Sequence, residues 1–263
     1  MRSSNLWNGV VGFWSATAGP SGYRLLDRSG RGNHGTLTNM TATDWVIDGG
    51  RYALDFDGSN DNIAIDSTLI LPTGPFSICW WEKITSVASF AAVCTLRTSS
   101  SGAFIVYRST FASYTFLTWR NVTSVAQTGF RASDASNPNS VVNTWRFFAI
   151  TGTASTSSTV GDFRAYENGL QLSLTNSANF GAVSTFVNAI CTDGVSTFNA
   201  MRLGDFIVFD RQLPNSEISN IYQIGRGGML TPRRRRRAYF VQTFSPSWAI
   251  GSNVVLQPSI GVS

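Results

Sequence analysis

The sequence predicts an all-β fold: a two-sheet antiparallel sandwich with one short helix and an extended C-terminal arm. Short runs of alternating apolar and polar residues are separated by Gly, Asn, Asp and Ser turns. Aromatic and β-branched residues are abundant, whereas charged residues make up only 13% of the 263 residues, as expected of a chain that is mostly strand and turn. A chain of this length buries one large β core within a single domain.

Ten strands are predicted from the alternating pattern. Leu54 and Phe56, for example, alternate with Asp55 and Asp57 before an Asp-Gly turn. Only Pro214–Ile224 has a helical period, with Ile218, Ile221 and Tyr222 on one face. The predicted strands are residues 10–14, 52–56, 62–65, 75–84, 90–97, 103–108, 114–119, 146–152, 161–168 and 201–209.

Several ordered motifs resemble the laminin-G-like group of concanavalin A-type jelly rolls. They are Gly12-Phe13-Trp14, the glycine loop Asp27–Leu37, Trp45, Phe56-Asp57-Gly58, Phe76–Trp81, Thr144–Ala149 and Gly204–Ile218. The resemblance covers about residues 9–224 and implies a concanavalin A-like jelly roll. We therefore expect a jelly-roll domain over residues 1–224, followed by a glycine hinge, an arginine run and an uncharged arm over residues 225–263.

The same resemblance implies a calcium site in the glycine loop. Calcium takes about six to eight oxygen ligands, mainly carboxylates and carbonyls. The candidate ligands are Asp27, Asn33 with the neighbouring carbonyls, and Asp205. Alternatively, Asp27 and Asn33 cap their own turn and Asp205 pairs with an arginine.

Aromatic residues are the candidates for glycan binding, because exposed rings stack on sugar faces in such folds. The candidates are Tyr23, Tyr107, Tyr114 and Trp119, each of which is alternatively a core or sheet-face residue.

Catalytic motifs are missing from the sequence. Glycoside hydrolysis uses two carboxyl groups at a set separation, but Glu82, Glu167 and Glu217 have no acidic residue two or four positions away. His34 is the only histidine and falls within the glycine loop. We expect a protein that is not an enzyme.

Cysteine usage and the N-terminal residues predict folding in a cytoplasm. Cys79, Cys94 and Cys191 are odd in number and fall in strand-like segments, which favours buried free thiols over a disulfide framework. The apolar residues of Met1–Thr17 are interrupted by asparagine and glycine, unlike a signal peptide. No apolar stretch approaches the ~20 residues of a membrane-spanning helix, so no membrane insertion is expected.

The C-terminal segment carries the net charge of the chain. The whole sequence has a net charge of +5, and without Arg233–Arg237 it has 15 basic and 15 acidic residues. A neutral body disfavours nucleic acid as the partner. The segment Ala238–Ser263 contains no charged side chain; it either adds a strand to its own sandwich or orders on a neighbouring subunit. The candidate partner-binding residues are Arg233, Arg234, Arg235, Arg236, Arg237, Tyr239, Phe240 and Trp248.

Cytoplasmic folding combined with a lectin-like sandwich favours a virion protein, because laminin-G-like domains occur among phage structural proteins and the C-terminal segment resembles theirs. We expect a head-decoration or tail- or fibre-associated subunit, anchored by the arm, with other virion subunits, further copies of itself and cell-surface glycans as partners. The alternative is a calcium-dependent carbohydrate-binding module of a bacterial surface or secreted system.

Overall fold

The computed structural model describes residues 6–65, 69, 71–86, 90–111, 114–123, 127–133, 142–157, 159–177, 187–194 and 196–227. For residues 90, 109–111, 114–116, 120–123, 127–131, 133, 176, 177 and 227 it describes the backbone only. The arginine run and the residues that follow it lie outside these ranges.

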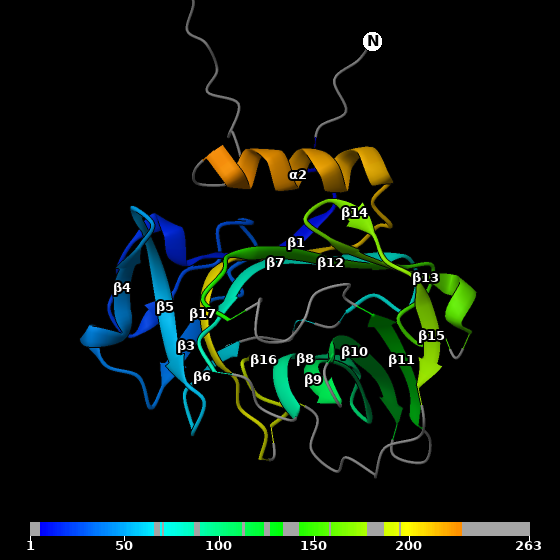
Figure 1. Ribbon diagram of the computed structural model, residues 1–263, viewed down its shortest axis with the longest axis horizontal. Coiled ribbons are helices and arrows are strands. Elements are labelled where there is room, and N and C mark those ends of the chain that lie inside the picture. Colours follow the sequence, from blue (N-terminus) through cyan, green and yellow to red (C-terminus); the bar gives the residue numbers. More distant parts are fainter. Residues whose placement is uncertain are drawn as a thin grey trace, which may run out of the picture. The chain divides into compact units, whose positions relative to one another are not determined.

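Two antiparallel sheets pack face to face, which confirms the predicted sandwich (Figure 1). The eight-stranded sheet contains β1 (Val10–Ser15), β4 (Trp45–Asp48), β5 (Arg51–Asp57), β7 (Phe76–Ile84), β12 (Arg146–Gly152), β13 (Phe163–Glu167), β14 (Leu170–Gln171) and β17 (Ala200–Phe209). The nine-stranded sheet contains β2 (Arg24–Leu25), β3 (Gly35–Thr38), β6 (Asn62–Ile65), β8 (Phe90–Ser99), β9 (Gly102–Phe111), β10 (Tyr114–Thr123), β11 (Gln127–Ser133), β15 (Leu174–Ser177) and β16 (Ala189–Ile190).

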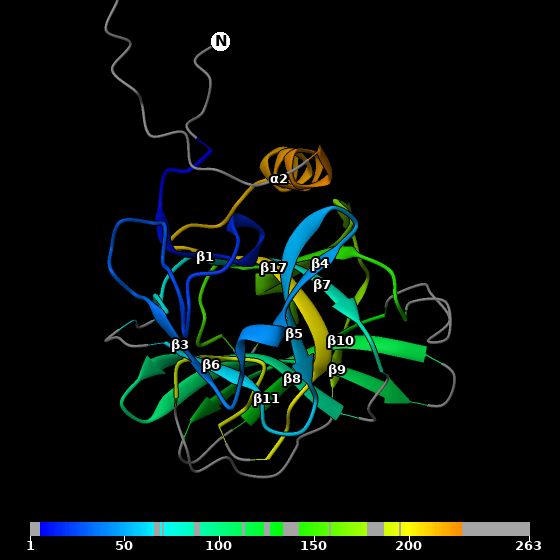
Figure 2. The ribbon, with the colours of Figure 1, turned by 90° about the vertical axis from the view of Figure 1, so that its left-hand side faces the viewer.

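Short helical elements complete the described fold. They are the 3-10 helices η1 (Ala16–Ala18), η2 (Ala42–Asp44) and η3 (Val160–Asp162) and the helix α2 (Asn215–Gly227). In Figures 1 and 2, α2 lies across the outer face of the eight-stranded sheet.

All ten predicted strands correspond to observed strands. The prediction missed β2, β3, β4, β14, β15 and β16, which have two to four residues each, and the seven-residue β11. Such short strands give too few alternations for a recognisable period, and Gly129 interrupts the pattern of β11.

The main core fills the space between the two sheets. Trp80 stacks on Phe148 with ring centroids 5.6 Å apart and lies 6.3 Å from Phe206. All three rings are fully buried. Burial of one such side chain contributes about 1.5–3 kcal/mol, so rings from β7, β12 and β17 anchor the centre of the eight-stranded sheet.

A second apolar cluster lies between this sheet and α2. Cys79 and Trp81 belong to it, whereas Trp80 faces the main core, so β7 is buried on both faces. This explains the continuous apolar run in β7. The prediction of buried free thiols is confirmed for Cys79, Cys94 and Cys191. Burial raises the pKa of each thiol far above its usual value, which keeps these sulfurs unreactive.

Helix α2 extends to Gly227, so the predicted boundary at Ile224 and the hinge that was expected to begin at Gly225 are corrected. Arg51 donates hydrogen bonds to the carbonyl oxygens of Gly225 and Arg226, which stabilises the last turn. A Cβ atom on Gly225 would lie 2.3 Å from Nε1 of Trp81, so close packing on the indole requires glycine here. The sequence pattern contains neither of these long-range contacts.

Candidate functional site

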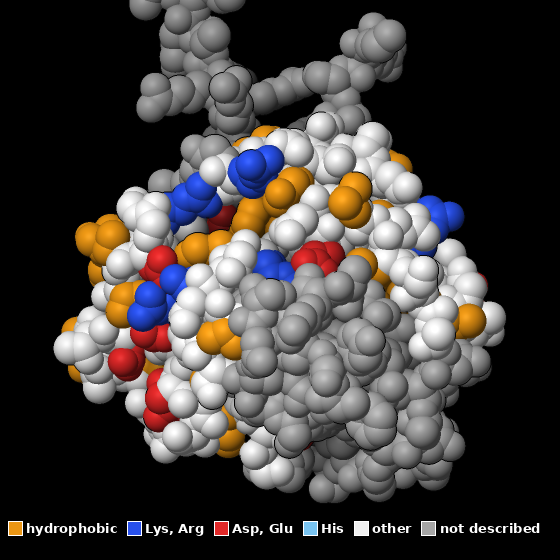
Figure 3. Space-filling model, viewed as in Figure 1, with side chains coloured by type: hydrophobic (Ala, Val, Ile, Leu, Met, Phe, Trp, Pro, Cys, Tyr) orange, Lys and Arg blue, Asp and Glu red, His pale blue; other side chains and the backbone are white. Residues whose placement is uncertain are grey.

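A pocket of about 280 Å³ opens on the outer face of the eight-stranded sheet, between α2 and the β4–β5 hairpin. We call it the α2 pocket. Its lining residues are Thr17, Asp48, Gly49, Arg51, Tyr52, Trp81, Trp145, Asn168, Gly204, Asp205, Tyr222 and Arg226. Figure 3, in the view of Figure 1, shows apolar, basic and acidic side chains close together between α2 and the β4–β5 hairpin. The volume is just below the roughly 300–1,000 Å³ typical of ligand sites.

The floor of the pocket is formed where the register of β17 shifts between Leu203 and Phe206. Leu203 and Phe206 both point into the main core, so the two residues between them interrupt the alternation. One of them is Gly204, where a Cβ atom would lie 3.1 Å from Cβ of Trp81. The other is Asp205, which lines the pocket. The irregularity therefore places the Asp205 carboxylate and the closely packed backbone of Gly204 at the floor.

Asp205 is held in place by two hydroxyl groups. Its Oδ1 accepts hydrogen bonds from Ser15 Oγ at 2.5 Å and from Thr17 Oγ1 at 2.8 Å. Its side chain is almost fully buried, at 2% exposed. A buried carboxylate fixed in this way is a preorganised acceptor for ligand hydroxyl groups.

Aromatic rings form the walls. Trp81 stacks on Tyr222 with centroids 5.7 Å apart and an interplanar angle of 20°. Trp145 and Tyr222 are half-buried, and Tyr52 keeps 38% of its surface exposed. Rings that keep exposed surface beside a fixed carboxylate can stack on the apolar face of a small polar ligand.

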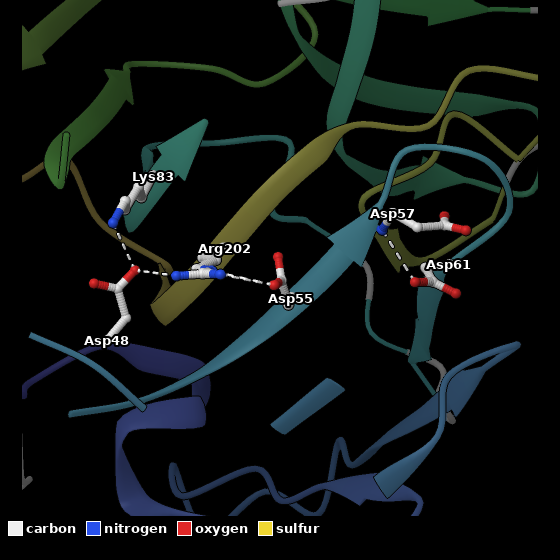
Figure 4. Close-up of polar contacts among 6 residues, drawn as sticks. All are labelled: Asp48, Asp55, Asp57, Asp61, Lys83 and Arg202. Atoms are coloured by element: carbon white, nitrogen blue, oxygen red, sulfur yellow. Dashed lines mark hydrogen bonds and ion pairs between the residues drawn. The ribbon is translucent and has the colours of Figure 1, made fainter. Parts of the chain in front are cut away.

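A chain of ion pairs borders the pocket at the hairpin (Figure 4). Asp48 accepts from Lys83 at 2.8 Å and from Arg202 at 2.7 Å, and Arg202 also pairs with Asp55 at 3.1 Å. Burial raises the pKa of Asp48, but the hydrogen bonds and charges of Lys83 and Arg202 outweigh this effect and leave its pKa below the usual value. Asp48 is therefore ionised and already paired at neutral pH.

Figure 4 also shows Asp61, whose Oδ2 accepts from the backbone N of Asp57 at 3.1 Å. Burial is the main cause that raises the pKa of Asp61, and nearby carboxylates raise it further. A raised folded-state pKa favours the protonated acid, so this group costs stability as pH rises above the unfolded-state pKa.

Asp61→Asn is expected to raise the Tm by about 1–3 °C at pH 7, because the amide oxygen keeps the hydrogen bond without a buried charge. At pH 3 the wild type and the variant should have the same Tm, since the side chain at position 61 is then neutral in both. Thermal melts at the two pH values test this. A variant that is less stable than the wild type at pH 7 would contradict it.

The Asp27 carboxylate does not fit a calcium ligand. Its Oδ1 accepts from the backbone N of Phe13 and of Ser29, and its Oδ2 accepts from Ser29 Oγ and the backbone N of Asn33, all within 2.9 Å. An ion would have to displace these four donors. The arrangement matches the turn-capping alternative, with the loop tied to β1.

The other two calcium candidates also have protein partners. The Asn33 carbonyl accepts from Trp14 Nε1, and its amide group donates to the Val11 carbonyl. Asp205 lines the α2 pocket and accepts a hydrogen bond from Ser15, and it takes no part in the hydrogen bonds described above for Asp27. Across the part of the chain that the structure describes, no three His, Cys, Asp or Glu residues gather as a metal would require.

The four predicted glycan-binding residues are not brought together. Tyr107 and Trp119 are at most 1% exposed, so their candidate role is corrected: neither ring has a free face for a sugar. Tyr23 is 69% exposed but does not line the α2 pocket. The side chain of Tyr114 and the partner-binding candidates Arg233–Arg237, Tyr239, Phe240 and Trp248 lie outside the described residues.

Comparison with known proteins establishes the family. Residues 57–219, more than half of the chain, match the family described as the concanavalin A-like lectin/glucanases superfamily. The chain belongs to this superfamily. Its described part is a lectin-like jelly roll with two antiparallel sheets and one C-terminal helix. No curated protein matches the chain.

Several solved structures share the fold of this superfamily member. The receptor-binding domain of botulinum neurotoxin D aligns with a TM-score of 0.57 and 12% identity over 84% of this chain and 54% of its own. The ligand-binding domain of botulinum neurotoxin serotype D in complex with N-acetylneuraminic acid aligns with a TM-score of 0.55 and 13% identity, over 84% of this chain and 52% of its own. A Trypanosoma rangeli sialidase aligns with a TM-score of 0.51 and 14% identity, over 83% of this chain and 33% of its own. The chain thus spans about half of each neurotoxin domain and a third of the sialidase, and these likenesses concern the fold alone.

Within the described residues, no helix is long and apolar enough to cross a membrane.

Proposed function

We propose that the domain binds carbohydrate in the α2 pocket and has no catalytic role. The observation that carries the proposal is the combination of half-exposed rings with the buried Asp205 carboxylate at the floor. Sugar sites pair an apolar ring face with fixed acceptors for hydroxyl groups. Among similar folds, a neurotoxin ligand-binding domain in complex with N-acetylneuraminic acid lends further support.

The absence of a catalytic role is inferred from how the pocket carboxylates are engaged. Asp48 is paired with Lys83 and Arg202, and Asp205 is fixed by two hydroxyl groups. Glycoside hydrolysis would require one carboxyl group as a proton donor and a second as a nucleophile or base. Asp48 does not have the environment of a proton donor, since Lys83 and Arg202 hold it as a carboxylate.

Trp145→Ala and Tyr52→Ala are each expected to lower the affinity for a glycan ligand about tenfold, the effect of losing one stacked ring. A glycan array would identify the ligand, and isothermal titration calorimetry would then compare the variants. Tyr23→Ala is the matched control, because Tyr23 is an exposed tyrosine that does not line the pocket. Equal losses in all three variants, or a loss with Tyr23→Ala alone, would contradict the proposal.

We further propose that the domain is displayed on a virion as a head-decoration or tail- or fibre-associated subunit, with the segment after α2 as its anchor. The support is the sequence: a neutral body followed by five arginines and an uncharged apolar segment. Because α2 ends at Gly227, deletion of residues 228–263 is the truncation that preserves the helix. Mass spectrometry of purified virions should detect the full chain and should not detect the truncated chain. Incorporation of the truncated chain would contradict the anchor.

A further inference from the structure

We infer that the α2 pocket takes a sugar residue that bears a carboxylate, with Arg226 as the partner of that carboxylate. This inference rests on the proposed carbohydrate binding and specifies its ligand class. It is argued from which charged side chains at the pocket already have protein partners and which are available to a ligand.

The acidic side chains at the pocket are already engaged. Asp48 is shared between Lys83 and Arg202, and Arg202 extends the network to Asp55. Asp205 has two hydroxyl groups on Oδ1. Asp48 therefore leaves no unpaired negative charge at the hairpin side of the pocket.

Arg226, on the last turn of α2, is a charged residue at the pocket that is available to a ligand. Its side chain is exposed and its guanidinium carbon lies 5.5 Å from the centre of the Tyr222 ring. It has no acidic partner among the residues that the structure describes. A guanidinium is a planar fork that matches a carboxylate with two hydrogen bonds, so Arg226 is an available anion partner at the rim.

The C-terminal end of a helix normally repels anions, because its free carbonyl groups carry a partial negative charge. Arg51 offsets this effect by donating to the carbonyl oxygens of Gly225 and Arg226. The charged residues that line the pocket are Arg51 and Arg226 with Asp48 and Asp205. Of the two acidic ones, Asp48 is compensated from outside the lining by Lys83 and Arg202.

The pocket therefore combines two kinds of polar group with aromatic walls. Asp205 accepts from hydroxyl groups, and Arg226 donates to an anion. A uronic or sialic acid residue has both groups on one ring. A neutral sugar would leave Arg226 without a partner, and a simple anion would leave the rings and Asp205 unused. The small volume fits a single residue at the end of a glycan.

The test compares methyl glucuronide with methyl glucoside, which differ only in a carboxylate against a hydroxymethyl group. Calorimetry on the full chain should show that the glucuronide binds about tenfold more tightly, as expected for a charge-assisted hydrogen bond. Arg226→Gln should abolish this preference. Arg97→Gln removes the same charge from β8 of the other sheet and should keep it. The methyl glycoside of N-acetylneuraminic acid, with its carboxylate free, is the second acidic probe.

Equal affinity for glucuronide and glucoside, or an unchanged preference in Arg226→Gln, would overturn the inference while carbohydrate binding stands. Displacement of the glucuronide by sodium acetate or inorganic phosphate at the same concentration would also overturn it, because the pocket would then be a general anion site. No binding of any glycoside would overturn the proposed function and the inference together.

Discussion

Glu82→Gln is expected to destabilise the sandwich by about 3–5 kcal/mol, because it breaks a buried ion pair between the two sheets. Glu82 Oε1 on β7 lies 2.9 Å from Arg108 Nε on β9, with side chains that are 1% and 3% exposed. The other oxygen accepts from Trp80 Nε1 at 2.8 Å. The variant keeps the shape and an acceptor for Trp80 but leaves the Arg108 charge buried without its carboxylate.

The surroundings of this pair increase the expected cost. The guanidinium of Arg108 lies 4.3 Å from the centre of the Phe148 ring, and that of Arg146 lies 4.9 Å from the same ring. Arg146 has its own carboxylate, Glu167. When the Glu82 charge is removed, the Arg108 guanidinium stays buried near a second cation, that of Arg146.

A double-mutant cycle measures the pair directly. Urea unfolding of Glu82→Leu, Arg108→Leu and the double variant should give a coupling of more than 2 kcal/mol, with the double variant close to wild-type stability, since well-packed apolar replacements of buried pairs are often neutral. Additive losses would contradict the account of a buried, mutually compensating pair.

Asp27→Ala is expected to destabilise the domain by about 2–4 kcal/mol, because it removes the acceptor of four hydrogen bonds and leaves the buried Phe13 N–H unpaired. The glycine loop should then be held on β1 mainly by the hydrogen bonds of Asn33 with Trp14 and Val11. Chemical unfolding measures the loss. The matched control is Asp57→Ala, whose carboxylate accepts from Ser59 and Asn60 in an exposed turn. That substitution should cost less than about 1 kcal/mol.

The same variant separates hydrogen bonding from calcium binding. If hydrogen bonds alone explain the role of Asp27, the Tm of the wild type should be the same in EDTA and in excess calcium. A wild-type Tm that rises with calcium, together with a Tm of Asp27→Ala that does not, would show that the loop holds an ion.

The sandwich could be predicted from the sequence because its long strands carry clear periods. Leu54 and Phe56 face the main core as their alternation indicates, and Ile218 and Ile221 face the sheet from α2. Strands such as β16, with two residues, exist only because neighbouring strands hold them. The end of α2 was missed for the same reason: Arg51 and Trp81 are distant in sequence from the turn that they stabilise.

The α2 pocket was largely beyond sequence reasoning. Asp205 was a candidate calcium ligand on the strength of the family resemblance, and that resemblance did not indicate a pocket. The available signal was Gly204-Asp205 between Leu203 and Phe206, which breaks the alternation of β17. Trp145 and Tyr222 gave no comparable signal, since half-exposed rings and core rings look alike in a sequence. Tyr107 and Trp119 were misjudged for this reason.

The most direct test of the central claim is a crystal structure of the domain with the glycoside that binds most tightly in solution. We expect density for one sugar ring in the α2 pocket, packed on Trp145 or Tyr52, with a hydroxyl group within hydrogen-bonding distance of Asp205. A sugar bound elsewhere, for instance at Tyr23 or on the nine-stranded sheet, with the α2 pocket empty, would contradict the account.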